Sequence, residues 1–198
     1  MRVIGIDPGT ARTGWGVVEV RVVEVRQQHG AERRGAERRG AEGKLQTLKP
    51  IDFGYIKTTP KHPNSERLKK IYEALLAVVE STTPDEMAIE KIFFNANVKT
   101  ALSVGQARGV CLLAAAVSGL PAFEYNTSEV KSVVTGYGRA TKSEVASRVK
   151  ELLRLEETPK PDDVTDALAI AATHIFLNFS ETGETKTKVA HSGAARTK

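Results

Sequence analysis

The segment VIGIDPGT, residues 3–10, decides the fold and raises a question about its own charge. Residues 3–6 form an apolar run of the kind that makes a buried central strand. The run ends on a carboxylate, Asp7, which is followed at once by a Pro-Gly turn. A carboxylate at this position either stabilises the turn or belongs to a functional site at the end of the strand. The residues in the rest of the sequence distinguish these two interpretations.

The composition predicts one folded domain with an appendage. The chain has 198 residues, 40% of them hydrophobic, which is enough for a single sizeable core. It contains no membrane-length apolar run and no signal-peptide pattern, so we expect a cytoplasmic protein. The only cysteine, Cys111, lies in an apolar stretch, which excludes a disulfide framework or a cysteine metal site and predicts a small core residue.

The net charge of +5 is confined to two segments, residues 26–44 and residues 180–198. The first repeats the pentad Gly-Ala-Glu-Arg-Arg and has no large apolar side chain, so a low-complexity insert is expected at about 27–46. A solvated loop is one interpretation, and a basic DNA-contacting arm is the other. The remainder, 1–179, is predicted to be the folded domain, and 180–198 a disordered basic tail.

The periodicity of the chain predicts a mixed α/β sheet covered by helices. Strands are expected at residues 3–6, 15–20 with an extension to 25, 51–58, 86–90 and 121–125. Helices are expected from Asn64 to before Thr83, over 97–118, over 128–134, after the capping-box pair Thr141 and Glu144, and over 162–177. The first two strands form an antiparallel hairpin, and the strand-helix-strand unit from 86 to 125 predicts a parallel crossover.

Carboxylates recur at the ends of predicted elements. Asp7 and Glu90 each end a strand, while Asp163 and Asp166 share one face at the start of the last helix, next to Asp162. Taken singly, each has an ordinary explanation in turn chemistry or the helix dipole. Four carboxylates brought together would repel one another without a cation, so their joint occurrence predicts a site for Mg²⁺ or Mn²⁺, with two ions about 4 Å apart acting on a phosphodiester.

Aromatic and basic residues near these carboxylates are candidates for DNA contact. Phe93 and Phe94 follow Glu90, and one of the two rings could stack on or wedge into bases. Lys131 and Lys142 flank a glycine-rich loop before a capped helix, where phosphate binds well. Other candidate phosphate contacts are Lys91, Lys99, Arg108 and Arg139.

Five ordered segments resemble one known family. They are IGIDPGTARTGWGV, AIEKIFF, GQARG, FEYNTSEVKSVVTGYGRATK and DDVTDALAIAATH. Together they are similar to the RuvC family of bacterial Holliday-junction resolvases over roughly residues 1–20 and 51–178. The resemblance implies an RNase H-like fold, a mixed five-stranded sheet with an antiparallel hairpin start and a parallel remainder, flanked by helices.

The same resemblance implies a structure-selective endonuclease of DNA recombination and repair, which cuts four-way junctions in pairs and leaves ligatable nicks. It implies a homodimer, two Mg²⁺ ions per active site, which Mn²⁺ can replace, and a branch-migration complex of the RuvA and RuvB type as partner. By motif, the metal ligands and catalytic residues fall on Asp7, Glu90, Asp163 and Asp166. The DNA-binding residues fall on Phe93, Lys131 and Lys142, with Arg108 and Arg139 as further candidates.

Two other classes of protein share parts of this pattern. An actin-like ATPase also begins with Asp-x-Gly-Thr at the end of a strand, but 198 residues can hardly supply the two lobes between which ATP binds. A catalytically silent junction-binding module, or a nuclease for RNA:DNA hybrids, could use the same fold. The full acidic set argues against the silent module, and the sequence alone does not decide between the DNA substrates.

Overall fold

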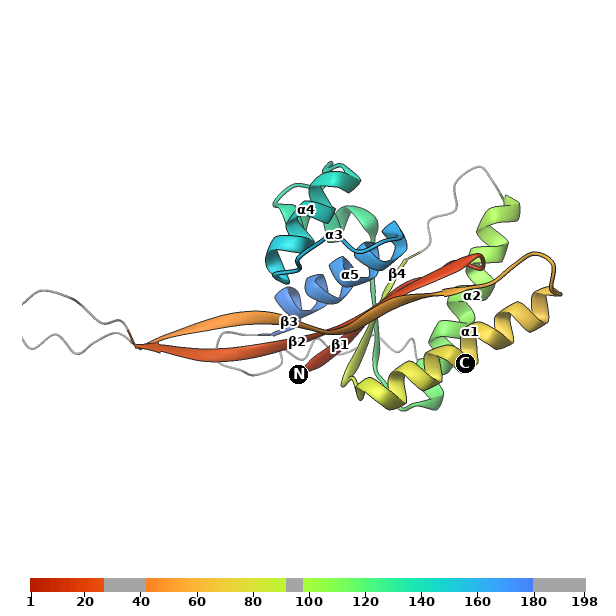
Figure 1. Ribbon diagram of the computed structural model, residues 1–198, viewed down its shortest axis with the longest axis horizontal. Coiled ribbons are helices and arrows are strands. Elements are labelled where there is room, and N and C mark those ends of the chain that lie inside the picture. The colour runs from red at the N-terminus through yellow and green to blue at the C-terminus, as the bar shows by residue number, and fades with distance from the viewer. Residues whose placement is uncertain (27–41, 92–97, 180–198) are drawn as a thin grey trace, which may run out of the picture.

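The computed structural model describes residues 1–26, 42–91 and 98–179, and shows one sheet with helices on both faces (Figure 1). The strands are β1 (Arg2–Asp7), β2 (Arg12–Arg26), β3 (Glu42–Lys57), β4 (Glu86–Glu90) and β5 (Ala122–Tyr125). The helices are α1 (Asn64–Thr82), α2 (Val98–Val117), α3 (Thr127–Thr135), α4 (Lys142–Leu152) and α5 (Asp162–Asn178). Across these described ranges, no helix is long and apolar enough to cross a membrane.

The five strands lie in the order β3-β2-β1-β4-β5. β2 pairs antiparallel with both β1 and β3, whereas β4 pairs in parallel with β1 and with β5. This confirms the predicted mixed sheet with an antiparallel start and a parallel remainder. β1 is central because it carries the apolar run of residues 3–6, which is covered on both faces.

Each face of the sheet has its own apolar core. Helices α3, α4 and α5 cover one face, where Val3, Val18 and Leu168 are buried. Helices α1 and α2 cover the other, where Ile4, Ile6 and other residues pack. Cys111 belongs to this second core and is fully buried, as predicted, and burial raises the pKa of its thiol to about 12.

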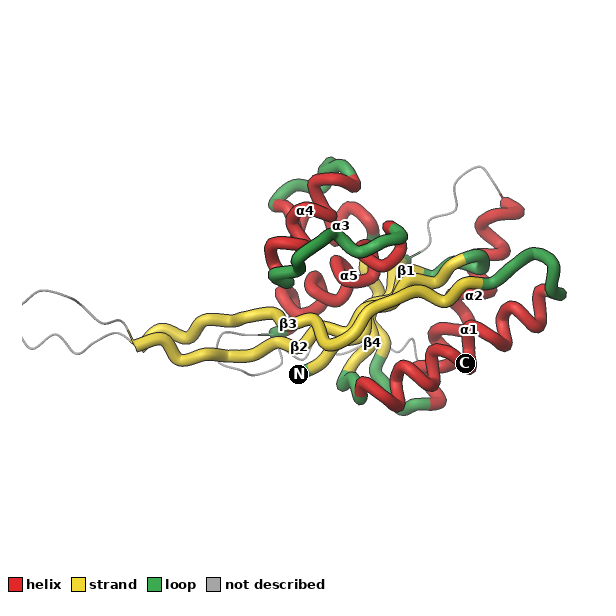
Figure 2. The backbone as a smooth tube through the Cα atoms, viewed as in Figure 1, coloured by secondary structure: helices red, strands yellow, loops and turns green. Residues whose placement is uncertain are grey.

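The structure extends two strands beyond the predicted limits. β2 and β3 pair from Arg12 with Lys57 to Arg26 with Glu42, with one register shift between Val17 and Val18, and they project past β1 as a two-stranded ribbon (Figure 2). β3 therefore begins inside the range predicted as the insert. The prediction missed this start because the alternation of apolar and polar residues there is short and gives only a weak strand signal. Residues 27–41 and the tail 180–198 lie outside the described residues, so the predicted domain limits stay a prediction. α3 begins one residue earlier than predicted, after Asn126, whose side chain accepts a bond from the Glu129 N–H and caps the helix.

α5 packs closely on β1 and β2 because the strand residues under it are glycines, and any larger side chain there would push the helix away. A Cβ atom at Gly5 would lie 2.0 Å from the carbonyl oxygen of Ala167, and one at Gly14 would lie 1.9 Å from that of Asp163. At Gly16 the same atom would meet the Leu168 side chain at 2.5 Å. The helix thus rests directly on the backbone of the two strands, and its first turn is held beside the end of β1.

A buried polar network joins the far end of α5 to the parallel strands. His174 is fully buried, and its Nε2 lies 2.5 Å from Oε2 of Glu86 on β4. Its Nδ1 lies 2.7 Å from the hydroxyl of Tyr125 on β5. Asn178, one turn further along α5, donates to the same hydroxyl at 2.7 Å. These bonds satisfy polar groups that would otherwise be costly to bury.

Replacing Gly5 with alanine tests the close approach of α5. Because the new methyl group would collide with backbone atoms, which cannot rotate away, we expect Gly5→Ala to lower the free energy of unfolding by about 1–3 kcal/mol or more. Ser147→Ala is the control, because Ser147 is exposed on α4 and the change removes an atom instead of adding one. At such a surface position the free energy of unfolding should change by no more than about 0.5 kcal/mol. Urea unfolding measures both variants, and equal effects would contradict the packing argument.

Candidate active site

Two neighbouring parallel strands bring Asp7 and Glu90 to the same edge of the sheet. Ile6 of β1 is paired with Ile89 of β4, so the next residue on each strand is a carboxylate. Both isoleucines point into the core under α1 and α2. Because side chains alternate along a strand, Asp7 and Glu90 point to the opposite face, the one that carries α5.

The first turn of α5 supplies the other two predicted carboxylates. Asp7, Asp166 and Lys142 line two adjoining cavities of about 600 and 240 Å³. The larger one also contains Asp163, and the smaller one contains Glu90. The structure therefore brings the four predicted carboxylates around one place, with Asp7 at its centre.

Three of these carboxylates contact a polar or basic side chain. Asp163 forms an ion pair with Arg12, whose Nε lies 3.1 Å from Oδ2. Asp166 lies 3.4 Å from Nζ of Lys142, the first residue of α4. For Glu90 the contact comes from α3, because the Thr127 hydroxyl donates to its Oε1 at 2.6 Å. The acidic cluster is thus partly neutralised by the protein itself.

Asp7 is the carboxylate that the site perturbs most. Burial, followed by the negative charges of Glu90, Asp166 and Asp163, raises the pKa of Asp7 from 3.8 to about 8. Burial also raises the pKa of Asp166, although Lys142 opposes that effect. In turn, Asp166 raises the pKa of Lys142. Such shifts indicate a site that has more negative charge than the protein balances.

The chemistry of these donors fits a hard divalent cation. Within the ranges that the structure describes, no three Asp, Glu, His or Cys side chains are arranged to hold one metal ion as they stand. The donor set nevertheless consists of carboxylate oxygens, which suit Mg²⁺ and Mn²⁺. The raised pKa of Asp7 indicates that its ionised form is unfavourable here and that a nearby cation would stabilise it. An incoming cation would compete with Arg12 and Lys142 for the carboxylates they contact.

The predicted DNA-binding residues lie in different places. Lys131 of α3 and Lys142 line the smaller acidic cavity together. Arg108 of α2 pairs instead with Glu124 of β5, at 2.5 Å, and belongs to neither set of cavity-lining residues. Arg139 is exposed in the loop between α3 and α4. Phe93 lies outside the described residues, so all assignments of DNA contact stay predictions.

The structure adds residues to the site that the sequence analysis missed. Arg12, Tyr55, Lys57 and Lys160 line the larger cavity beside the carboxylates. Arg12 lies within one of the quoted family segments and could have been noticed there. Tyr55 and Lys57 could not, because their place depends on the register between β2 and β3, which pairs Lys57 with Arg12.

Comparisons with known proteins agree on one family. The family model described as crossover junction endodeoxyribonuclease RuvC matches residues 40–174. The crossover junction endodeoxyribonuclease RuvC of Brevibacillus brevis is 45% identical over 185 residues, which cover 91% of this chain and 98% of the relative. A structure of Thermus thermophilus RuvC has a TM-score of 0.72 and 36% identity, covering 89% of this chain and 94% of that one. The same protein in complex with a Holliday junction substrate gives 0.71 and 34%, with the same coverage.

The sheet order and the acidic edge define the class, a nuclease of the RNase H-like fold. Within that class, the chain belongs to the RuvC family of crossover junction endodeoxyribonucleases. This assignment removes the actin-like ATPase as an interpretation of the first strand and its turn.

Replacing Asp7 with asparagine should make the metal-free protein more stable at high pH. The folded pKa of about 8 lies above the unfolded value of about 3.9, so the folded state keeps a proton that the unfolded state releases. Stability therefore falls as pH rises from about 4 to about 8. We expect the free energy of unfolding of Asp7→Asn to exceed that of the wild type by more than about 1 kcal/mol at pH 8, which is the value of one pKa unit. At pH 5 the difference should be smaller.

Urea unfolding with a chelator present measures this difference. Asp52→Asn is the control, because Asp52 is an exposed carboxylate on β3. A gain for Asp7→Asn that is equal at both pH values would contradict the crowding of carboxylates around Asp7.

Proposed function

We propose that this chain resolves four-way DNA junctions by paired, metal-dependent hydrolysis of phosphodiester bonds, and leaves nicks that a ligase can seal. The observation that carries the proposal is the convergence of four carboxylates from β1, β4 and α5 around Asp7, in a chain of the RuvC family. A relative of 34% identity is known in complex with a Holliday junction substrate. We also expect the protein to act in the cytoplasm.

Asp7, Glu90, Asp163 and Asp166 would hold the metal, and we expect two ions at the site. Bound Mg²⁺, or Mn²⁺ in its place, would lower the pKa of the attacking water and stabilise the leaving oxygen. The rigid strand β1 and the first turn of α5 hold the carboxylates in place.

Basic residues at the site would bind the DNA backbone. Lys142 and Arg12 contact Asp166 and Asp163 in the structure. With their carboxylates bound to a cation, both basic side chains would be free to contact the phosphate groups beside the scissile bond. Lys131, on the wall of the smaller cavity, adds a third positive charge. Phe93 is assigned to a base at the junction on the resemblance alone.

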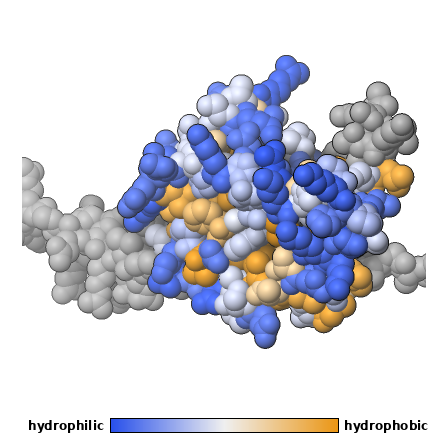
Figure 3. Space-filling model, turned by 45° about the vertical axis from the view of Figure 1, so that its right-hand side comes forward, coloured by the Kyte–Doolittle hydropathy of each residue, from blue (hydrophilic) through white to orange (hydrophobic). Residues whose placement is uncertain are grey.

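Paired cutting requires two active sites, so we propose that the chain works as a homodimer. α2 presents exposed apolar side chains, among them Leu102, Leu113 and Val117, which are 64%, 54% and 60% exposed. The exposed Gly105 and Gly109 of the same helix would allow a partner helix to approach closely. Figure 3 turns the side with α1 and α2 forward, and apolar areas interrupt its hydrophilic surface. A branch-migration complex of the RuvA and RuvB type stays a proposed partner.

Cleavage assays test the catalytic assignment. With Mg²⁺ present, the wild type should nick a synthetic four-way junction in symmetrical pairs, and leave a linear duplex and an RNA:DNA hybrid largely intact. Asp7→Asn should cut at least about 100-fold more slowly, because several kcal/mol of metal stabilisation is lost. A chelator should abolish cutting by the wild type.

Asp162→Asn is the matched control for the carboxylates of α5. It removes the same charge one residue before Asp163, from an exposed position. We expect it to keep most of the activity, while Asp163→Asn loses it. Equal cutting of all three substrates, or full activity in Asp7→Asn, would contradict the proposal.

Sedimentation tests the dimer. We expect a mass of two chains at micromolar concentration without DNA. Leu113→Glu places a charge in the apolar face of α2. Loss of a leucine buried in the interface weakens the free energy of association by about 1.5–3 kcal/mol, so the dissociation constant should rise at least about tenfold. Leu177→Glu, in an exposed leucine of α5, is the control. A mass of one chain for the wild type would count against the dimer.

A further inference from the structure

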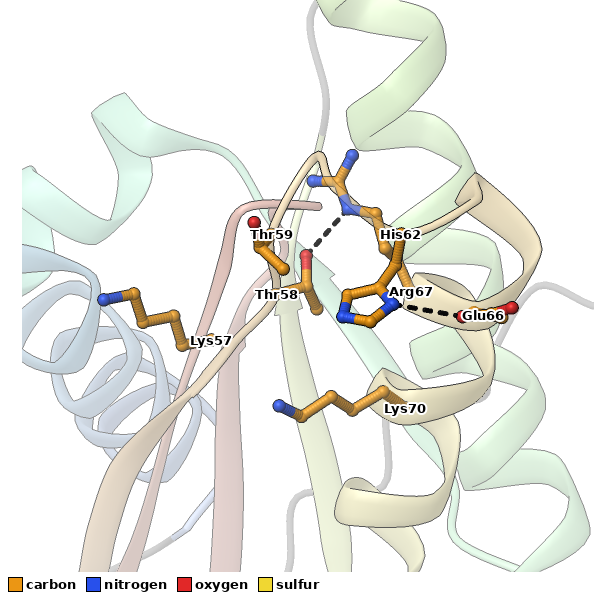
Figure 4. A pocket seen from close by; sticks show the side chains of 7 residues that line it. All are labelled: Lys57, Thr58, Thr59, His62, Glu66, Arg67 and Lys70. Atoms are coloured by element: carbon orange, nitrogen blue, oxygen red, sulfur yellow. Dashed lines mark hydrogen bonds and ion pairs between the residues drawn. The ribbon is translucent and has the colours of Figure 1, made fainter.

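A positively charged cavity lies where β3 ends and α1 begins, and we call it the β3–α1 cavity (Figure 4). Its volume is about 420 Å³. Among the described residues, three basic side chains line it, Lys57, Arg67 and Lys70, against one carboxylate, Glu66. That carboxylate is already engaged, because its Oε2 lies 3.2 Å from Nδ1 of His62. The cavity therefore carries net positive charge.

Hydrogen bonds hold Arg67 and the wall of the cavity in place. Arg67 donates through Nε to the hydroxyl of Thr58 at 2.8 Å, and through Nη2 to the carbonyl oxygen of Thr10 at 2.9 Å. The buried Thr58 hydroxyl donates to the same carbonyl, and the Thr58 N–H donates to the carbonyl oxygen of Ala11 at 3.0 Å. These bonds tie α1 to the turn that follows β1. The guanidinium is thus a fixed positive charge rather than a mobile one.

The two lysines complete a site for an anion. In Figure 4 the side chain of Lys70, from α1, extends toward the end of β3, whereas that of Lys57 extends from the end of β3 away from the other labelled side chains. Both are exposed, so they can move onto a bound group. Two mobile ammonium groups beside a fixed guanidinium suit a group with several charged oxygen atoms, of which a backbone phosphate is the commonest in nucleic acids.

Lys57 connects this cavity to the acidic site. The same side chain lines both the β3–α1 cavity and the larger acidic cavity. In the β2–β3 ladder, Lys57 is paired with Arg12, which contacts Asp163. Basic side chains therefore run from the carboxylates, across the edge strand of the sheet, to the start of α1. A DNA strand that leaves the acidic site in this direction meets positive charge along its path.

We propose that the β3–α1 cavity binds a backbone phosphate of one junction arm, outside the acidic site. This inference rests on the proposed function, since it takes junction DNA as the substrate. The contact is independent of base sequence and fixes the direction in which the arm leaves the active site. Neither the acidic cluster nor the family segments include Lys70, Arg67 or Lys57.

Lys70→Gln tests the site through salt dependence. Binding of a fluorescent four-way junction is measured by anisotropy, with a chelator to prevent cutting, between about 50 and 200 mM salt. One lost phosphate contact should weaken binding several-fold at low salt and reduce the slope of log K against log salt by about 0.9. Lys69→Gln is the matched control, because the neighbouring Lys69 pairs with Glu73 at 3.5 Å and does not line the cavity.

Glu66→Gln gives a result of the opposite sign. Removing the negative charge of Glu66 from the cavity should tighten junction binding, while the folded state, checked by thermal unfolding, stays intact. Equal effects of Lys70→Gln and Lys69→Gln, or no effect of either, would overturn the proposal. Cleavage by the wild type is scored separately, so a failure of junction cutting contradicts the proposed function, whereas a failure of the slope difference contradicts only this cavity.

Discussion

The contact on which the site depends is the close approach of α5 to the glycines of β1 and β2. A side chain at Gly14 would occupy the place of the Asp163 backbone, and one at Gly5 that of the Ala167 carbonyl oxygen. Gly14 is also the β2 residue paired with Asp7. The first turn of α5 therefore rests on the residue next to the end of β1. Without this approach, the carboxylates of the helix and of the strands would be separated by a layer of side chains.

This packing places charges where they destabilise the folded protein. Burial and neighbouring carboxylates raise the pKa of Asp7 to about 8, which means that its ionised form is disfavoured. Arg12 and Lys142 offset part of the repulsion through Asp163 and Asp166. The two apolar cores on either side of the sheet supply the stability that permits such a site. The core under α5 borders the site directly, since Val130, Val145 and Ile170 belong to it and also line the smaller acidic cavity.

The fold and the carboxylates were accessible from the sequence because both are local patterns. The apolar runs that end at Asp7 and Glu90 and the helical period after Asp163 each lie within a short segment. The basic residues of the β3–α1 cavity were not accessible, since their neighbourhood depends on strands paired across the insert. The ion pair between Arg108 and Glu124 was not accessible from the sequence either, because it joins α2 to β5, and the role of Arg108 in DNA contact stays a prediction.

The buried network at His174 has a consequence for the opposite end of α5. A helix turns by about 100° per residue, so any two points on it fix the direction of every other side chain. Glu86 and Tyr125 hold His174 in one orientation, while Asn178 repeats the contact one turn away. The network therefore fixes the rotation of α5 about its own axis. This rotation sets the direction in which the side chains of Asp163 and Asp166 point, although they lie about 12 Å or more away along the helix.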